Sequence, residues 1–357
     1  MTLALVVAAV TLVSLLLFVG STEHRPEPVE EVPVECTGGG DVGPRPHLAV
    51  GRPFRLVSWN LQFGAGRKHQ FFYDGGDAVH VPKADVDEAV KALQRALAAY
   101  APDVALLQEI DRDSDRTHRI DQLPLLAGAA GAGADCTAAA TYHRSPLVPS
   151  PMPVPLGRVD MNLGIFTRGP LTGAKRLALP LLAESRLRQA FNLKRAVLAG
   201  QAPIDGHPLP LRLAVTHLSA FSHGDGTLER QVAVLAKWME EQSDDPAQPW
   251  ILAGDFNLLP PGDDPARLTV ESSLYADAKN PIEELIPRFR TLFPVADLLA
   301  EQARTYVPYG ADAPDRKIDF VFIGGPIEVV SARVGREHIA LSDHLPLVAD
   351  LKIVPRN

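Results

Sequence analysis

Polar residues stand at or near the ends of several apolar runs that are typical of buried strands. One run, Trp250–Ala253, is followed by Gly254, Asp255, Phe256 and Asn257. Side chains alternate along an extended backbone, so Asp255 and Asn257 are expected to point the same way and Phe256 the opposite way. A carboxylate and a carboxamide offer oxygen ligands to a hard cation and an amide donor to a negatively charged substrate oxygen. Alone, the stretch is equally compatible with an Asp/Asn turn after a core strand.

Similar residues close the other apolar runs of the chain. The complete set is Asn60, Glu109, His217, Asp255, Asn257, Asp319, Asp343 and His344. A single polar residue at a strand end usually makes a turn, but this many carboxylates, amides and histidines indicate a site assembled by the scaffold. Binding residues of layered α/β folds collect at strand ends.

Strands and two helices are needed to position this set. Strands are expected over residues 54–62, 103–110, 159–167, 186–200, 211–218, 250–253, 316–323 and 348–353, with a further strand opening at 304–306. Helices are expected over residues 85–100, capped by Asp85, and 227–242, because their apolar residues have helical spacing. Residues 64–83 carry basic and aromatic side chains and are expected to form a loop overhanging the site. Residues 123–155, rich in Ala, Gly and Pro, permit no assignment.

The composition indicates one folded domain. The chain has 357 residues, of which 46% are hydrophobic and 22% charged, and its net charge is −8. This charge argues against a broad basic surface for nucleic acid, although a local basic groove is compatible with it. Neither an internal repeat nor a proline-rich break divides the chain from residue 48 onward, so we expect a single catalytic domain over residues 48–357.

The N-terminal part of the chain differs from the rest. Residues 3–20 are almost wholly apolar and marginally long enough to span a bilayer. Residues 1–21 are therefore either a signal peptide or an uncleaved membrane anchor, and no Lys or Arg precedes the run to indicate its orientation. Residues 22–47 are rich in Pro, Glu and Gly and are expected to be a linker. The protein is expected to be membrane-anchored, secreted or periplasmic.

The chain contains two cysteines, Cys36 and Cys136. They show no CxxC or Cys/His spacing, so a structural zinc site is not indicated. They could pair as one disulfide in an exported domain and would stay free in the cytosol. The sequence leaves both alternatives open, because it does not show how far apart the two residues lie.

Six short motifs, in this order, resemble those of the endonuclease/exonuclease/phosphatase superfamily, which includes deoxyribonuclease I and neutral sphingomyelinases. They are Trp59-Asn60-Leu61-Gln62, Leu107-Gln108-Glu109, Thr216-His217-Leu218, Gly254-Asp255-Phe256-Asn257, Lys317-Ile318-Asp319 and Ser342-Asp343-His344. The resemblance covers the chain from about residue 48 to the C-terminus. It implies a four-layer α/β/β/α sandwich with two packed mixed sheets and the site at one end of them, here preceded by the N-terminal hydrophobic segment.

The resemblance also implies a metal site. Glu109 would be the principal ligand of Mg²⁺, helped by Asn60 and Asp343, and Mn²⁺ or Ca²⁺ could take the place of Mg²⁺. A hard cation held by few protein oxygens keeps positions open for water and substrate. Such a cation polarises a phosphoryl oxygen and stabilises the leaving oxygen.

The remaining residues of the set would act on the substrate. By the same resemblance, His344 would orient or deprotonate the attacking water, with Asp319 as its carboxylate partner. Asp255 and Asn257 would position the nucleophile and the scissile phosphate, and His217 would contact a phosphate oxygen. In-line displacement at phosphorus needs charge stabilised on both sides, which these groups can supply.

The implied function is a metal-dependent phosphoesterase acting on a phosphodiester or phosphomonoester, and its substrate stays open. A lipid headgroup, a nucleic acid and a small phosphodiester are all compatible, and no obligate protein partner is indicated. An extracytoplasmic nuclease would use a basic groove, for which the candidates are Arg67, Lys68, Arg186, Arg188, Lys194 and Arg195. Gln62 stands where abasic-site endonucleases carry Asp, which argues against DNA repair. A non-catalytic binding protein with this fold would lack one of Glu109, Asp255, Asn257 or His344, and all four are present.

Overall fold

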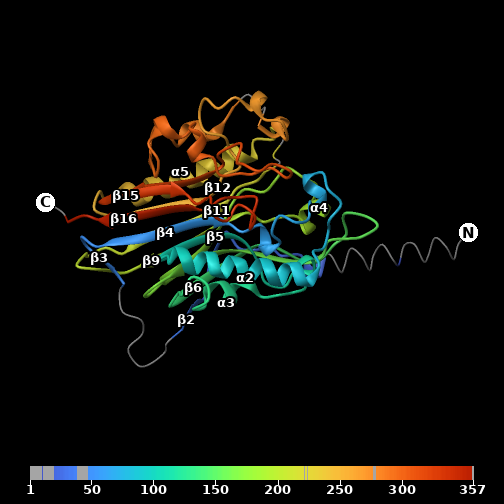
Figure 1. Ribbon diagram of the computed structural model, residues 1–357, viewed down its shortest axis with the longest axis horizontal. Helices are drawn as coiled ribbons and strands as arrows, with labels where there is room; N and C mark the ends of the chain where they lie inside the picture. The colour runs from blue at the N-terminus through green and yellow to red at the C-terminus, as the bar shows by residue number, and fades with distance from the viewer. Residues whose placement is uncertain are drawn as a thin grey trace, which may run out of the picture.

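Two seven-stranded sheets pack face to face in the computed structural model, which describes residues 10, 20–37, 47–220, 222, 224–275 and 279–355 (Figure 1). The first sheet has, in spatial order, β1 (Val29–Glu31), β8 (Thr172–Ala178), β9 (Ala196–Ala202), β11 (Leu211–His217), β12 (Trp250–Asp255), β14 (Asp319–Gly324) and β13 (Arg290–Thr291). The second has β15 (Ile327–Val334), β16 (Leu347–Ile353), β4 (Pro53–Asn60), β5 (Val104–Asp111), β7 (Gly157–Thr167), β6 (Cys136–Val148) and β2 (Val34–Cys36). A separate short pair joins β3 (Leu48–Ala49) to β10 (Ile204–Asp205).

Helices cover the outer face of each sheet. The second sheet carries α2 (Lys83–Tyr100) and α3 (Gln122–Ala127), and the first carries α5 (Thr227–Ser243) (Figure 1). A short helix, α4 (Arg186–Phe191), lies at one end of the sandwich. Single 3₁₀ turns are η1 (Gln62–Gly64), η2 (Phe72–Asp74), η3 (Asp115–Thr117), η4 (Pro265–Arg267), η5 (Ser272–Tyr275), η6 (Pro281–Glu284), η7 (Val295–Asp297) and η8 (Glu301–Ala303).

Three apolar layers hold the sandwich together. The sheets share a central core of fully buried side chains that includes Leu106, Ile165 and Val215. Outside it, Leu93 of α2 packs on the second sheet and Leu235 of α5 packs on the first. Burying an aliphatic side chain of this size contributes about 1.5–3 kcal/mol. The four-layer α/β/β/α sandwich with two mixed sheets is thus confirmed.

Most of the expected elements are present, but three of them differ. Residues 186–200 were expected to be one strand and are instead α4 followed by β9, because the Ser185 hydroxyl accepts a hydrogen bond from the Arg188 N–H and caps a helical turn. Asp85 does not cap α2; Pro82 holds that position, and Asp85 lies in the first turn, where its charge favours the helix N-terminus. At residues 304–306 only isolated bridges at Tyr306 are found among the described residues.

Part of the expected linker belongs to the sheets. β1 pairs antiparallel with β8 of the first sheet, and β2 pairs antiparallel with β6 of the second. The linker prediction is therefore wrong for residues 29–36. These strands sit at sheet edges, where backbone hydrogen bonds suffice and exposed polar side chains are tolerated, so composition did not reveal them.

The apolar run lies largely outside the described residues, and the domain boundaries stay a prediction. Within the ranges that the structure describes, no helix combines the length and apolar character needed to cross a bilayer.

A disulfide joins Cys36 of β2 to Cys136 of β6 across 100 residues of chain. Closing so long a loop restricts the unfolded chain. We therefore expect the double variant Cys36→Ser/Cys136→Ala to lose about 2–5 kcal/mol of unfolding free energy in urea titrations. Wild type under reducing conditions should show the same loss. An unchanged urea midpoint in both samples would contradict a stabilising role for the bond.

Candidate active site

Strand register aligns three of the predicted residues in one row. His217 lies opposite Asp255 in the parallel pair β11–β12, and Asp255 lies opposite Asp319 in the antiparallel pair β12–β14. Residues that are direct cross-strand neighbours present their side chains on the same face. The His217 Nε2 and Asp255 Oδ2 atoms are 3.2 Å apart. Gly254 permits this close register, because a Cβ at that position would collide with the Thr216 carbonyl oxygen.

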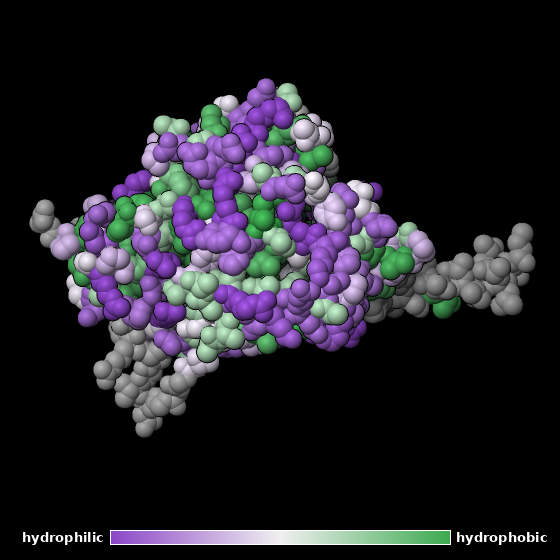
Figure 2. All heavy atoms as spheres, viewed as in Figure 1, coloured by the Kyte–Doolittle hydropathy of each residue, from purple (hydrophilic) through white to green (hydrophobic). Residues whose placement is uncertain are grey.

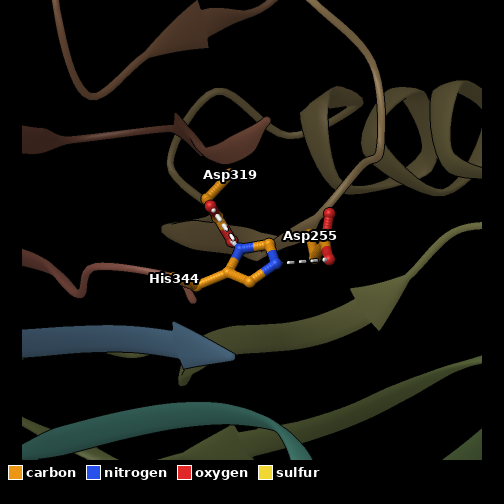
Figure 3. Close-up of side chains that lie close together, drawn as sticks. All are labelled: Asp255, Asp319 and His344. Atoms are coloured by element: carbon orange, nitrogen blue, oxygen red, sulfur yellow. Dashed lines mark hydrogen bonds and ion pairs between the residues drawn. The ribbon is translucent and has the colours of Figure 1, made fainter. Parts of the chain in front are cut away.

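His344 completes this row from the segment that precedes β16. Its Nδ1 lies 2.9 Å from Asp319 Oδ2, and its Nε2 lies 3.5 Å from Asp255 Oδ2 (Figure 3). The backbone of His344 is fixed on both sides, since its carbonyl oxygen accepts a 2.8 Å hydrogen bond from Trp59 Nε1 and its N–H donates to Ser342 Oγ. The imidazole is therefore held between two carboxylates.

The other sheet supplies Asn60 and Glu109. Asn60 ends β4 and Glu109 lies near the end of the neighbouring parallel strand β5, where Asn60 pairs with Gln108. The Asn60 Nδ2 donates to Glu109 Oε1 at 3.2 Å and to Asp255 Oδ2 at 3.1 Å, so one amide links carboxylates of the two sheets. Glu109 lies at a register shift of β5 with φ of +58°. A positive φ in a residue other than glycine is costly and is found most often at functional sites.

Asp343 approaches the same carboxylates from the loop beside His344. Its N–H donates to Gln62 Oε1 at 3.1 Å, and Ser342 Oγ lies 2.8 Å from the Asn60 carbonyl oxygen. These bonds tie the loop to the end of β4, so Asp343 and Glu109 come from neighbouring parts of one sheet. Asp343 is close enough that its charge helps to raise the pKa of Glu109.

Buried negative charge is the dominant electrostatic feature of the site. Burial raises the pKa of Glu109 and of Asp343, and it raises the pKa of Asp255 to about 7 although His344 opposes that shift. Burial acts against a charge on His344, yet the carboxylates of Asp319 and Asp255 raise its pKa well above the ordinary histidine value. Raised carboxylate pKa values mean that these groups lack sufficient positive charge around them. A bound cation would supply that charge.

The site contains donor atoms that suit a divalent metal. Ligand atoms of Asp255, Asp319 and His344 lie within 4.8 Å of one another. Glu109 and Asp343 offer carboxylate oxygens, the ligand type that hard cations such as Mg²⁺ prefer. Among the described residues, Glu109 accepts one hydrogen bond, from Asn60, which leaves most of its oxygen lone pairs free for a cation.

His217 and Asn257 are constrained by their surroundings. His217 Nδ1 lies 3.3 Å from the Tyr142 hydroxyl, and burial together with the Arg195 charge lowers the pKa of His217 well below its usual value. Both effects disfavour a positive charge on His217. Asn257 has φ of +52°, its N–H donates to Asp255 Oδ1 at 2.9 Å, and its Nδ2 donates to the Leu218 carbonyl at 3.1 Å.

These side chains surround one cavity of about 610 Å³. Of the predicted set, those that line it are Glu109, His217, Asp255, Asn257, Asp343 and His344. Asn60 and Asp319 are not part of the lining but contact residues that are. Asn60 accepts the Gln62 N–H with its Oδ1 and directs its amide at two carboxylates, so the geometry shows it orienting ligands. Its direct contact with a metal stays a prediction.

The overhanging loop is present, but the predicted basic groove is not assembled as expected. Phe72, Tyr73 and Asp74 of the segment 64–83 line the cavity. Arg67 instead donates to the Pro308 and Ala311 carbonyls, and Lys68 pairs with Asp85 and Glu88. Of the six candidate cations, the cavity lining includes Arg188 and Arg195. The sequence does not show in which direction a long basic side chain points, so it could not separate these two arginines from the other four residues.

Sequence reasoning missed Tyr142 and Arg195 as partners of His217. The Arg195 guanidinium lies 5.3 Å from the centre of the Tyr142 ring, whose hydroxyl approaches His217. Tyr142 falls within the Ala-rich stretch that permitted no assignment. Tyr142 lies in the middle of β6, so it does not show the pattern of a polar residue at the end of an apolar run. Its contact with His217 becomes visible only in the packed structure.

Comparison with known proteins identifies the family to which this chain belongs. Residues 57–344 match the sequence model of the Endonuclease/Exonuclease/phosphatase family. The chain belongs to this family. It is therefore a hydrolase of phosphate ester bonds, in a family whose enzymes depend on a divalent metal, and it carries a candidate acidic and histidine metal cluster.

Solved structures of low sequence identity share the fold of this family member. An endonuclease/exonuclease/phosphatase from Beutenbergia cavernae DSM 12333 is 22% identical, with a TM-score of 0.58 over 85% of this chain and 72% of that one. The human Nocturnin catalytic domain with bound sulfate is 17% identical, with a TM-score of 0.52 over 90% and 97% of the two chains. A humanized D. rerio TDP2 is 15% identical, with a TM-score of 0.51 over 84% and 99%. A search of curated protein sequences finds no match.

Proposed function

We propose that this protein is a Mg²⁺-dependent phosphoesterase that cleaves a phosphodiester by in-line attack of water. The observation that carries the proposal is the buried His344–Asp319 pair, 2.9 Å apart, on the same cavity as the carboxylates of Glu109 and Asp343. A base held by a carboxylate, next to oxygen ligands for a hard cation, meets the needs of phosphoryl transfer.

His344 acts as the base that takes a proton from the attacking water. Asp319 accepts the Nδ1–H of His344 and so fixes the tautomer in which Nε2 is free to accept a proton. Asp255 Oδ2 lies 3.5 Å from that Nε2, so the two groups can hold one water between them and aim its oxygen lone pair at phosphorus. The oxygen–phosphorus bond to the leaving group breaks as the new one forms.

Glu109 and Asp343, oriented by Asn60, would hold the metal. A divalent cation bound there would stabilise negative charge on the phosphoryl and leaving oxygens and would oppose a positive charge on His344, which favours the neutral base. Asn257 and His217 donate hydrogen bonds to phosphate oxygens. Mn²⁺ or Ca²⁺ can occupy the same oxygen ligands.

The disulfide supports a location outside the cytoplasm. Disulfides persist in oxidising compartments, and the apolar run of residues 3–20 is of the kind that directs export or anchoring. We therefore place the domain on the outer side of a membrane, either attached to it or released from it.

A substrate panel with and without EDTA tests this proposal. Plasmid DNA, RNA, sphingomyelin and phosphoinositides are incubated with the full chain and Mg²⁺, Mn²⁺ or Ca²⁺ in turn. We expect at least one phosphodiester to be hydrolysed with Mg²⁺ present and none after chelation. The proposal is overturned if hydrolysis is unaffected by EDTA. It is also overturned if no substrate is hydrolysed with any of the three metals.

A further inference from the structure

The cavity combines a polar floor with apolar walls. The catalytic side chains form the floor, whereas the walls contain many apolar side chains. These are Phe72, Val148, Leu156, Met161, Phe191, Leu193 and Leu274. Three arginines line the cavity. Arg116 is bound by Asp111 at 2.8 Å, Arg195 lies over the Tyr142 ring, and Arg188 forms no ion pair with a residue that the structure describes. A polynucleotide needs a row of free cations along its backbone, whereas these walls suit an apolar group attached to a phosphate.

Exposed apolar side chains border the mouth of this cavity. Met152 and Val154, in the loop between β6 and β7, are 78% and 51% exposed, and Leu187 on α4 is 53% exposed. Both segments also line the cavity, through residues such as Leu156 and Phe191. We call Met152, Val154 and Leu187 the mouth patch. Single exposed apolar residues are ordinary, but a group around one cavity indicates a contact surface.

Figure 1 shows the β6–β7 loop and α4 at the same end of the sandwich. Figure 2 shows apolar atoms exposed at this end of the molecule among polar ones. The loop connects two strands of the second sheet, and α4 lies between β8 and β9 of the first sheet. The residues of the mouth patch therefore come together only when the two sheets pack.

The N-terminal chain reaches the domain at this end. Glu23 Oε1 lies 3.7 Å from Lys194 Nζ, and Lys194 follows α4 by three residues. The apolar run ends at Gly20, three residues before Glu23. Three residues span at most about 10 Å, so a membrane-inserting sequence would end within that distance of the docking point.

Positive charge is available on the same helix. Arg186 and Arg188 of α4 are exposed, and neither guanidinium forms an ion pair with any residue that the structure describes. Arginines near a bilayer surface attract anionic lipid headgroups. Apolar side chains flanked by cations are the composition of a surface that lies in a lipid interface.

We propose that this end of the molecule docks on a lipid bilayer and that the cavity takes a phosphodiester lipid from it. The phosphate binds on the polar floor and the apolar part of the lipid lies against the walls. This inference rests on the proposed function, because it names the substrate class of the same site. A bilayer fits better than a protein partner, since Glu23, which follows the apolar run by three residues in the sequence, lies at the same end as the mouth patch and the free arginines.

The test compares lipid and soluble substrates in the same preparation. The full chain is reconstituted into phosphatidylcholine/phosphatidylglycerol vesicles that contain sphingomyelin or phosphoinositide. The variant Met152→Ser/Val154→Ser/Leu187→Ser should hydrolyse the vesicle lipid at least about tenfold more slowly, since apolar contact with the bilayer is lost. Its hydrolysis of soluble bis(p-nitrophenyl) phosphate should equal that of wild type, because none of the three side chains touches the floor.

A matched control uses exposed apolar residues elsewhere. Val295, Leu299 and Val330 are 57%, 48% and 50% exposed and lie outside the cavity lining. Their triple serine variant should match wild type on both substrates. Equal lipid hydrolysis by the mouth-patch variant and wild type overturns docking. So does equal slowing of vesicle-lipid hydrolysis by the control variant.

Docking can also be measured without catalysis. In the His344→Ala background, Val154→Cys labelled with an environment-sensitive fluorophore should show a blue shift on reconstitution into the same vesicles. Leu299→Cys labelled in the same way should not shift. A blue shift in the first together with no hydrolysis by the wild type would refute the proposed function and keep the docking surface. No shift alongside active hydrolysis of the soluble substrate would refute docking alone.

Discussion

Replacing His344 with alanine is expected to lower kcat for bis(p-nitrophenyl) phosphate by about 10²–10⁴-fold, the usual contribution of a general base. The imidazole lies on the cavity with Nδ1 bound by Asp319 and Nε2 3.5 Å from Asp255 Oδ2, which leaves Nε2 positioned to accept a proton from a water molecule. Steady-state kinetics at saturating Mg²⁺ measure the effect, with circular dichroism to verify folding. KM should change far less than kcat, because the base acts on water rather than on substrate binding.

Two further variants make this prediction specific. His207→Ala removes a histidine that bonds the Leu209 carbonyl outside the cavity and should leave kcat unchanged. Asp319→Asn should lower kcat by disturbing the tautomer of His344, and adding it to His344→Ala should cost little more. Fully additive losses, or a His344→Ala enzyme as fast as wild type, would show that the pair does not work as one unit.

The second large effect is expected from Glu109→Gln. Glutamine keeps the size of the side chain and removes the charge that holds the cation, whose stabilisation of the transition state is worth several kcal/mol. Activity should fall at least about a hundredfold, which corresponds to about 2.7 kcal/mol, and the Mg²⁺ concentration for half-maximal rate should rise. Glu241→Gln, on the exposed face of α5, should leave both quantities unchanged.

A stability measurement separates loss of metal binding from misfolding. Burial, followed by the charge of Asp343, raises the pKa of Glu109 in the folded protein. A carboxyl whose folded pKa lies above its unfolded value destabilises the fold at neutral pH, where the unfolded group is fully ionised. Glu109→Gln should therefore melt no lower than wild type in EDTA, and wild type alone should gain stability on adding Mg²⁺. A variant that melts lower in EDTA would instead indicate a structural role.

The sequence predicted the strand ends because their signal is local. An apolar run followed by a carboxylate identified Asp255 and Glu109. The alternation of side chains predicted that Phe256 points away from Asp255, and Phe256 is buried in the core cluster that includes Leu235 of α5. The register that sets His217, Asp255 and Asp319 in one row depends on pairing between strands far apart in sequence. No local pattern encodes that pairing.

Features that depend on tertiary contacts could not be predicted. Tyr142 lies in the middle of a long strand and meets His217 only after the sheets pack. The edge strands β1 and β2 have the polar composition of a linker, because their side chains remain exposed. The apolar walls of the cavity come from strands, loops and helix ends distributed along the chain. Leu187 and Met152 are ordinary surface residues by sequence, and only the folded structure brings α4 and the β6–β7 loop to the same end.

The claim that a divalent metal at Glu109 and Asp343 supports hydrolysis by His344 is tested most directly by a metal titration. The full chain is stripped with EDTA, the chelator is removed, and the rate of bis(p-nitrophenyl) phosphate hydrolysis is followed as Mg²⁺ is added. We predict no activity in the stripped protein, a saturable return of the wild-type rate, and no return in Glu109→Gln at the same Mg²⁺ concentrations. A stripped protein as active as the untreated one, or a Glu109→Gln variant that recovers in parallel with wild type, would contradict the account.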